Sequence, residues 1–159
     1  MDMRERAANE TFARYPNIQI VADQRVGSNE EGASVAESIM IAHPNVKAIW
    51  VGWDGPAMAA AAALNNLGKE VFIASPDLGR DGAFSIASGG LFIGAGAQHP
   101  FDQGVAAGLI GMASLAGKAT PQYVVVPGRK VVRDNLAEAW EAIYHSPMPT
   151  PIANALAGE

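Results

Sequence analysis

The chain has 159 residues, 17% of them charged, and a formal net charge of −5 at pH 7. This acidic balance, with no long run of Lys or Arg, argues against a nucleic-acid-binding surface. The sequence contains no cysteine, which excludes disulfides, thiolate catalysis and Cys–zinc sites, and no stretch approaches the roughly 18 continuous apolar residues of a membrane span.

At this length the chain is one domain or part of a larger one. The predicted elements of its first half are, in chain order, a helix over 3–15, a strand over 17–23, a loop over 24–32, a helix over 33–42, a strand over 46–52 and a helix over 57–67. Ile and Val enrichment favours the first strand, and the polar loop contains two glycines. Asp54 and Pro56 are typical of a helix start, and Gly68 of a helix end.

The elements predicted for the second half are a strand over 70–75, a turn over 76–81, a helix over 81–88, a strand over 91–98, a helix over 100–115, short strands over 122–126 and 130–132, and a helix over 136–144. Gly89 and Gly90 close the short helix, and Gly94 and Gly96 allow close backbone approach in the strand that follows. The tail over 146–159 carries three prolines and is expected to be irregular or partly disordered.

The alternation of strands and helices predicts an α/β fold, with a three-layer, Rossmann- or flavodoxin-like sheet that is mostly parallel. Right-handed crossovers place helices on both faces of such a sheet. We expect residues 1–145 to form one lobe of this kind and residues 146–159 to form a proline-rich C-terminal tail.

Polar or aromatic side chains follow four of the predicted strands at their carboxyl ends, namely Asp23 and Gln24, Trp53 and Asp54, Asp77, and Gln98. In an open parallel sheet all carboxyl ends share one rim, and small molecules bind there. Carboxylates and amides hydrogen-bond hydroxyl groups, and an indole ring stacks on the C–H face of a sugar. The pattern therefore predicts a rim that binds a polyhydroxylated ligand.

These residues also have structural interpretations. Asp77 could be a turn residue and Trp53 a core residue, and Asp54 fits a helix cap better than a direct ligand contact. Asp102, in the first turn of a predicted helix, is interpreted as a partner of the helix dipole. The three histidines lack the spacing of metal ligands, so no metal site is expected.

The segment 27–34 has the glycine rhythm of a phosphate-binding loop. It lacks the Gly-Lys-Ser/Thr ending, and its two glutamates would repel phosphate, so no nucleotide or other cofactor is expected. There is no Gly-x-Ser-x-Gly motif. Asp54 and Asp77 could form a carboxylate pair, but nothing separates their roles, so the chain is not expected to be an enzyme.

Several short motifs follow one another in a defined order: Tyr15-Pro16 before 18–22, Ala42-His43-Pro44-Asn45 before 46–50, the Asp54 turn before 57–61, Leu67-Gly68-Lys69-Glu70-Val71 before the strand that ends at Asp77, Ala97-Gln98-His99-Pro100, Gly117-Lys118, and Val132-Arg133-Asp134-Asn135. No single motif is specific, but their order and spacing are. Together, from Arg4 to Asn135, they resemble the C-terminal half of type I periplasmic sugar-binding proteins, the ribose-binding-like solute receptors of ABC importers.

The resemblance implies that a sugar lies between two lobes and contacts this lobe at four places. They are Arg4 (with Arg6 as the alternative), Trp53, Asp77 and Gln98. Asp54 is a further candidate for ligand contact. Where the family often has Asn-Asp this chain has Trp53-Asp54, and the loop near Gly27 lacks the aromatic residue that the family often has there. These departures indicate a sugar or polyol other than ribose.

The same resemblance implies a partial receptor. The N-terminal lobe and the first strand and helix of this lobe have no counterpart, and residues 100–120 would pack on the missing lobe. An unprotected sheet edge and an uncovered helix over 101–117 favour a homodimer or higher oligomer. The intact protein would have an ABC permease as partner and, if exported, a periplasmic location, although the charged N-terminus of this chain does not resemble a signal peptide.

The sequence thus predicts the solute-binding component of an ABC importer for a sugar or polyol, present as a truncated C-terminal lobe. The alternatives are the effector-binding core of a LacI-type regulator and a small α/β enzyme. LacI-type cores usually carry a Val-Pro-x-Asp link where this chain has Gly68-Lys69-Glu70-Val71. A phospho-receiver domain fits less well, because Asp23 stands alone and no lysine closely follows Ala97.

Overall fold

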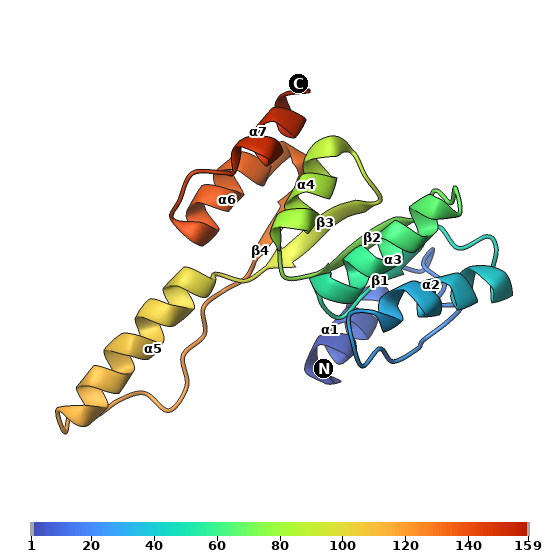
Figure 1. Ribbon diagram of the computed structural model, residues 1–159. Coiled ribbons are helices and arrows are strands. Elements are labelled where there is room, and N and C mark those ends of the chain that lie inside the picture. Colours follow the sequence, from blue (N-terminus) through green and yellow to red (C-terminus); the bar gives the residue numbers. More distant parts are fainter. Residues whose placement is uncertain (1, 159) are drawn as a thin grey trace.

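The computed structural model describes residues 2–158, and strands and helices alternate in it between residues 31 and 132 (Figure 1). The helices, in chain order, are α1 (Asp2–Phe12), α2 (Glu31–Ala42), α3 (Asp54–Asn66), α4 (Arg80–Ser88), α5 (Pro100–Leu115), the short 3-10 helix η1 (Arg133–Asn135), α6 (Leu136–Tyr144) and α7 (Thr150–Ala157). The strands are β1 (Ala48–Trp50), β2 (Phe72–Pro76), β3 (Phe92–Ala97) and β4 (Arg129–Val132). None of the helices described is both long and apolar enough to cross a membrane.

The strands form one sheet in the order β1-β2-β3-β4. β1, β2 and β3 are parallel, with Ala48 beside Phe72 and Ala74 beside Gly94, whereas β4 runs antiparallel to β3. The carboxyl ends of the three parallel strands therefore meet at one rim. The predicted α/β fold class with a mostly parallel sheet is confirmed.

The core lies between the sheet and helices α3, α4 and α6. Ile73 and Phe92 are fully buried, and α4 approaches so closely that a Cβ on Gly82 would lie 3.1 Å from the Phe92 ring. Successive side chains of a strand point to opposite faces, and the neighbouring Phe72 and Ile93 are 59% and 44% exposed. Helices therefore cover one face of the sheet tightly and leave much of the other face open, so the second helical layer predicted for that face is largely missing from the described lobe.

Most predicted helices lie where the sequence places them. Helix α5 begins and ends at the predicted residues, and so does α6. Helix α3 ends at the expected glycine, since Gly68 has a φ of +62°, and α4 ends at Gly89, which has a φ of +73°. Such left-handed φ values favour glycine and terminate helices.

The prediction of a strand over 17–23 is wrong. The backbone of this segment is irregular, and Ile18, Ile20 and Val21 are 49%, 52% and 42% exposed. A strand needs a neighbour to which its N–H and C=O groups can bond, and β1, at the edge of the sheet, pairs only with β2. High β-propensity without a partner strand did not produce a strand here.

Two predictions for the C-terminal third are also wrong. Residues 122–126 are irregular and return along α5, where Val124 and Val126 share a small hollow with Ile110 (Figure 1). The tail is not irregular throughout, because residues 150–157 form α7, which packs on α4 and buries Ile152. Proline in the first turn of a helix is compatible with helix formation, so Pro151 does not prevent it.

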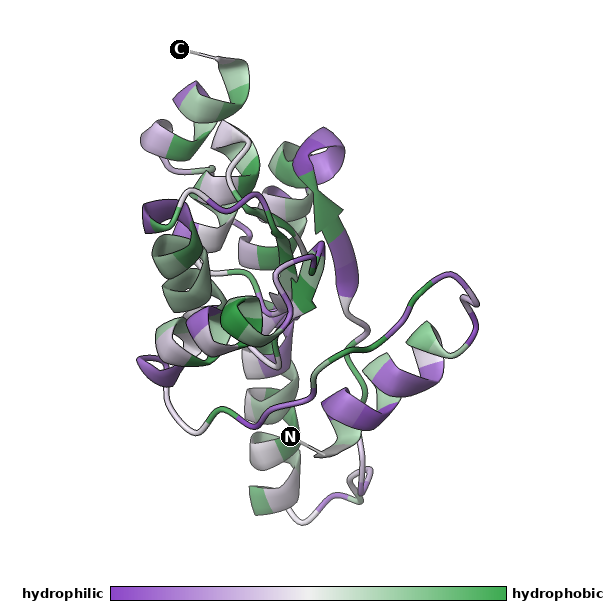
Figure 2. Ribbon diagram, turned by 90° about the vertical axis from the view of Figure 1, so that its right-hand side faces the viewer, coloured by the Kyte–Doolittle hydropathy of each residue, from purple (hydrophilic) through white to green (hydrophobic). Residues whose placement is uncertain are grey.

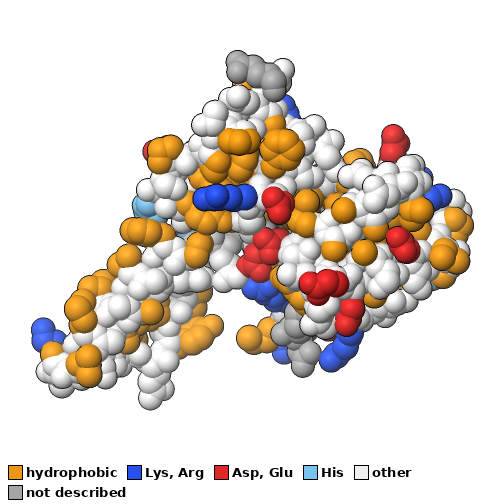
Figure 3. Space-filling model, in the orientation of Figure 1, with side chains coloured by type: hydrophobic (Ala, Val, Ile, Leu, Met, Phe, Trp, Pro, Cys, Tyr) orange, Lys and Arg blue, Asp and Glu red, His pale blue; other side chains and the backbone are white. Residues whose placement is uncertain are grey.

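Helix α5 and the returning segment 116–128, here called the arm, project from the lobe (Figure 1). No residue of α5 is buried. Figure 3 shows apolar side chains along the arm, and the exposed ones on α5 are Phe101, Val105, Leu109, Met112 and Leu115. Helix α1 is also peripheral, but it is mostly hydrophilic (Figure 2). The arm is therefore the largest apolar element that the described lobe leaves uncovered.

Candidate functional site

Asp77, directly after β2, is the centre of a polar cluster at the rim. The Nη1 and Nη2 atoms of Arg4 lie 2.9 and 3.3 Å from its two carboxylate oxygens, and Nη1 also donates to the carbonyl oxygen of Gly52 at 2.9 Å. The Asp77 backbone has a φ of 71°, and its N–H donates to Gly96 at 3.3 Å. A non-glycine residue in this left-handed region is uncommon, and such residues concentrate at functional sites. Arg4 thus connects the ends of β1 and β2 through one guanidinium.

Gln98, which follows β3, joins the same cluster. Its Nε2 donates a short hydrogen bond to Asp77, and its Oε1 accepts one from Gln103 Nε2 at 3.0 Å. Three of the predicted site residues, Arg4, Asp77 and Gln98, therefore lie together. They come from a helix, the end of β2 and the end of β3, as convergence at one rim predicts. Gln103, in the second turn of α5, was not predicted, because a glutamine in an amphipathic helix gives no signal of its own.

Trp53 lies immediately before α3 and is only partly buried, so the structural interpretation as a core residue does not apply. Its indole Nε1 donates to Asn29 Oδ1 at 2.7 Å. Asn29 belongs to the loop before α2 and was not among the predicted site residues. Its partner is 24 residues away, and no local pattern could have indicated the pair.

Asp54 is not the helix cap that the sequence favoured. The residue in the capping position of α3 is Trp53, and no side chain caps this helix end. Instead the Asp54 carboxylate lies against the turn after β2, since a Cβ on Gly79 would be 2.7 Å from Asp54 Oδ2. Asp54 is therefore near the turn that carries Asp77. Its carboxylate also lies in the first turn of α3, where the positive end of the helix dipole stabilises a negative charge.

Tyr144, at the end of α6, lies under the Asp77 turn and was not predicted. Its hydroxyl donates a short hydrogen bond to the Leu78 carbonyl, and its ring packs on Trp140 with centroids 4.3 Å apart. Burial raises the pKa of Tyr144, with smaller contributions from the carboxylates of Asp54 and Asp77. Each of these effects disfavours the phenolate. The neutral phenol supports the backbone that carries Asp77.

A second polar cluster lies at the base of the arm. Asp102 Oδ2 is 3.2 Å from His99 Nδ1, and Asp102 Oδ1 is 3.1 Å from His145 Nε2. The His145 ring also packs on Phe101, with centroids 4.4 Å apart. Asp102, interpreted from the sequence as a dipole partner, therefore joins α5 to the end of α6. Across residues 2–158, no group of three or more His, Cys, Asp or Glu side chains is arranged to hold a metal ion.

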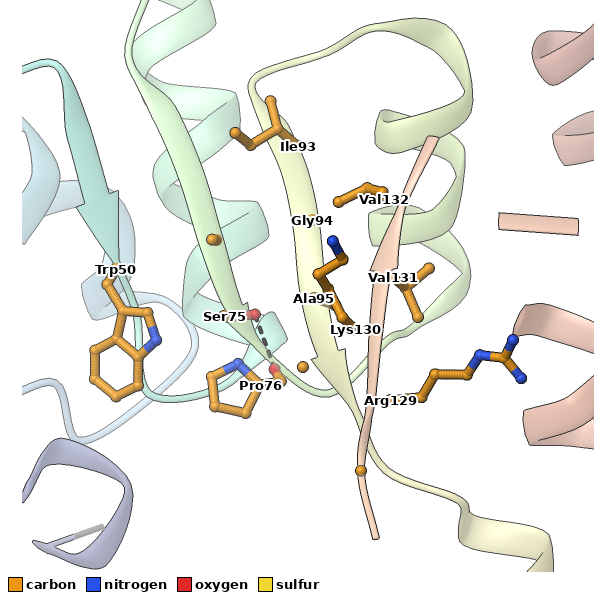
Figure 4. A pocket seen from close by; sticks show the side chains of 13 residues that line it. Trp50, Ser75, Pro76, Ile93, Gly94, Ala95, Arg129, Lys130, Val131 and Val132 are labelled. Carbon is orange, nitrogen blue, oxygen red and sulfur yellow. Dashed lines mark hydrogen bonds between the residues drawn. The ribbon is translucent and has the colours of Figure 1, made fainter. Parts of the chain in front are cut away.

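A hollow of about 530 Å³ opens over the less covered face of the sheet, with Trp50, Ile93, Gly94, Lys130 and Val132 in its wall (Figure 4). Most of this wall is aliphatic or backbone, so it offers few groups that could select among hydroxyls. The rim is different. Figure 3 shows acidic and basic side chains side by side in the concave region between the arm and the lobe. We therefore take the rim as the candidate site.

The rim can exchange hydrogen bonds in both directions with a neutral polyhydroxylated molecule. Arg4 supplies only donors, the Asp77 carboxylate only acceptors, and the Gln98 amide both. The side chains of Arg4 and Asp77 are 37% and 25% exposed, so a ligand can reach them. Their opposite charges are paired with each other, which favours a ligand without net charge.

The fold is that of one lobe of a type I periplasmic binding protein. The chain belongs to the family described as periplasmic binding protein domain, whose sequence model matches residues 1–119. The resemblance seen in the sequence is thereby confirmed.

Two relatives are named as sugar-binding proteins. A D-apiose import binding protein from Actinobacillus succinogenes is 35% identical over 106 residues, which cover 64% of this chain and 33% of that protein. The D-allose-binding periplasmic protein of Escherichia coli K12 is 33% identical over 125 residues, which cover 76% of this chain and 40% of that protein. The chain thus spans between a third and two fifths of these relatives.

Solved structures give the same picture of the fold. An ABC transporter solute-binding protein from Agrobacterium vitis, bound with alpha-D-tagatopyranose, matches with a TM-score of 0.81 at 19% identity. The match covers 90% of this chain and 49% of that chain. The structural likeness extends over nearly the whole lobe and about half of a complete receptor.

Proposed function

We propose that this chain is the sugar- or polyol-binding lobe of the solute receptor of an ABC importer. The observation that carries the proposal is the meeting of Arg4, Asp77 and Gln98 at the carboxyl ends of β1–β3. The named ligands of the relatives, D-apiose and D-allose, support a sugar as the ligand class.

In the proposed complex, Arg4 donates to sugar oxygens, Asp77 accepts from hydroxyls and Gln98 does both. Trp53 supplies an apolar plane beside these polar groups. Asp54 lies against the turn that carries Asp77 and extends the acidic side of the rim. In the lobe without ligand, Arg4 and Gln98 already hydrogen-bond Asp77. A sugar must replace or join these bonds, and this cost limits the affinity of the lobe alone.

In an intact receptor, residues 1–145 would be one lobe, and residues 100–120 would pack on the second lobe. The ligand would bridge the two lobes and shift the equilibrium between an open and a closed state. An ABC permease would be the partner, and the periplasm the location, as the name of the D-allose relative suggests for such a receptor. The uncovered apolar face of α5 supports this placement of the second lobe.

We propose binding without chemical conversion of the sugar. The relatives are named as binding proteins, not as enzymes. At the rim the Arg4 guanidinium is paired with Asp77 and cannot act as a general base, because it stays protonated. The proposed partners include no nucleic acid, in keeping with the net charge of −5.

For this chain by itself we propose a homodimer or higher oligomer. The open edge of β1 offers backbone hydrogen-bonding groups, and the arm offers the exposed side chains of Leu109, Met112 and Leu115. Unpaired edges and apolar patches of this kind promote association between identical chains.

The test is a titration of the chain with D-allose, followed by calorimetry and by tryptophan fluorescence. Because one lobe provides half of the contacts, we expect a dissociation constant of about 1 mM or weaker, equivalent to about −4 kcal/mol or less favourable. Asp77→Asn should remove the binding that remains. Asp134→Asn is the matched control, because it changes an exposed carboxylate beyond the end of β4, away from the rim. Nanomolar affinity, or equal loss in both variants, would contradict the proposal.

A further inference from the structure

The indole of Trp53 makes one side-chain hydrogen bond, to the loop before α2. Indole has a single polar atom, the Nε1–H donor, and in this chain that donor is bonded to Asn29 Oδ1 at 2.7 Å. The Trp53 backbone is extended, with φ −159° and ψ 168°, just before α3 begins. A partly exposed tryptophan at such a junction would otherwise be free to rotate about its side-chain bonds.

Asn29 itself is held by close packing between two helix starts. A Cβ on Gly55 would lie 2.8 Å from Asn29 Nδ2, so the amide rests directly on the backbone of the first turn of α3. A Cβ on Gly32 would lie 2.7 Å from Pro56 Cα, so the first turn of α2 also touches α3. The Gly32 contact requires glycine, because a Cβ there would meet the backbone of α3, and a Cβ on Gly55 would displace the Asn29 amide.

The loop around Asn29 is ordered by its own hydrogen bonds. The Gly27 N–H donates to Glu31 Oε2 at 2.7 Å, the Glu31 N–H to Ser28 Oγ at 3.3 Å, and the Gly32 N–H to the Asn29 carbonyl at 3.2 Å. The position of the Asn29 side chain is therefore fixed from both directions, by the loop and by α3.

We propose that Asn29 is a positioning residue that locks the Trp53 indole in one orientation, so that the rim presents a fixed aromatic face to a ring-form sugar. This inference rests on the proposed function and narrows its ligand class. With its N–H already bonded, the indole offers a ligand only its apolar faces and edges. A cyclic sugar has a continuous C–H face that can stack on such a plane, whereas an acyclic polyol of the same carbon number has none that is rigid.

Ring orientation and ligand preference are measured separately. The indole N–H signals of the three tryptophans are followed by NMR in an isotopically labelled chain, and Trp53→Phe identifies the Trp53 signal. Asn29→Ala removes the acceptor, Asn29→Asp keeps an acceptor oxygen, and Asn66→Ala is a control at an exposed asparagine at the far end of α3.

We expect Asn29→Ala to move the Trp53 signal and to speed its exchange with water several-fold, while the signals of Trp50 and Trp140 stay in place and report an intact fold. Asn29→Asp should restore the signal, and Asn66→Ala should leave it unchanged. A merely structural role for Asn29 would move all three signals together. A Trp53 signal that does not move in Asn29→Ala overturns the inference, whatever the chain binds.

The ligand class is tested with D-allose and its acyclic alcohol, allitol. We expect allitol to bind about tenfold more weakly than D-allose, the size of one stacking contact, and this ratio to shrink in Asn29→Ala. Equal binding of the two by the wild type overturns the assigned class. If neither ligand moves the Trp53 signal, the proposed function fails and the ligand class with it. The effect of Asn29→Ala on the Trp53 signal of the ligand-free chain still decides the role of Asn29.

Discussion

Helices α3 and α5 have similar residues and opposite surroundings. Both consist largely of small residues, alanine in α3 and alanine and glycine in α5, with a few large apolar side chains, but six residues of α3 are buried and none of α5 is. Helix α3 packs on α2, on β2 and on β3, whereas α5 projects from the lobe and contacts the end of α6 through its first turn, where Asp102 pairs with His145 (Figure 1). The comparison shows that local sequence makes a helix, and that burial depends on what the rest of the chain places beside it.

The largest expected effect is the difference in the free energy of unfolding that is lost when one leucine in each of these helices is changed to alanine. Leu64 of α3 is fully buried and Leu109 of α5 is 57% exposed. Leu64→Ala should lower the free energy of unfolding by about 2–5 kcal/mol, because it leaves a cavity in the core. At a protein concentration at which the chain is monomeric, Leu109→Ala should change it by about 0.5 kcal/mol or less, because the site is then solvated. Urea unfolding of both variants measures the difference, and equal losses would show that the arm is packed in solution.

The next effect concerns self-association through the arm. Changing Leu109 and Met112 together to lysine places two charges on the exposed apolar face of α5. If that face joins two copies, each buried side chain contributes about 1.5–3 kcal/mol, and the double variant should be a monomer by analytical ultracentrifugation. Leu67→Lys, at a 51% exposed leucine just after α3, is the matched control and should not change the association state. A wild-type chain that sediments as a monomer would refute the proposed oligomer.

A smaller effect is expected at the rim, where Asp77 has a φ of 71°. Asp77→Ala and Asp77→Gly both lose the ion pair with Arg4, so their difference reports the backbone alone. Glycine tolerates left-handed φ values, and alanine does not, so Asp77→Gly should be more stable by about 1 kcal/mol. Thermal unfolding compares the two. An alanine variant as stable as the glycine variant would mean that the Asp77 backbone is not held in the left-handed region.

The smallest expected effect is at Tyr144, whose hydroxyl donates to Leu78. Tyr144→Phe should cost about 1 kcal/mol at neutral pH, the usual net value of one hydrogen bond. Because burial and the nearby Asp54 and Asp77 raise the pKa of Tyr144 above 10.0, the unfolded chain loses the phenol proton first. The stabilising contribution is complete below pH 10.0 and is lost as the pH rises through the folded pKa.

Measuring the free energy of unfolding as a function of pH therefore tests whether the Tyr144 phenol is buried. The difference in the free energy of unfolding between wild type and Tyr144→Phe should become smaller above pH 10.0. Tyr123, which is 81% exposed on the arm, is the matched control, and Tyr123→Phe should show no such change. A difference in the free energy of unfolding between wild type and Tyr144→Phe that is the same at every pH would mean that the phenol is not buried.

Much of the rim could be predicted because it depends on local patterns and on one geometric rule. Asp77 and Gln98 are polar residues that end apolar segments, and parallel strands bring their carboxyl ends together. Arg4 was predicted through the family resemblance, since nothing in its own segment marks it. Asn29 and Tyr144 were missed because their partners are 24 and 66 residues away and neither residue belongs to a motif.

The errors have a common cause. Residues 17–23 and 122–126 have the composition of strands, but they pair with no strand of the described sheet. A β-strand cannot satisfy its backbone hydrogen bonds without a neighbouring strand. Helices satisfy their backbone internally, so α5 and α6 were predicted at their bounds although only α6 is buried. Helix α7 was missed because the three prolines of the tail were interpreted as breakers, whereas Pro151, the one within α7, lies in the first turn, where proline is compatible with a helix.

The sequence alone determined the positions of most helices, the alternation that makes an α/β lobe, and the polar residues that end its strands, because these depend on neighbours along the chain. The tertiary structure decided which apolar segments became strands, which helix was left uncovered, and how Asn29 fixes Trp53. Those outcomes depend on partners that are distant in the chain, and the free energy of burial and pairing is released only when such partners meet.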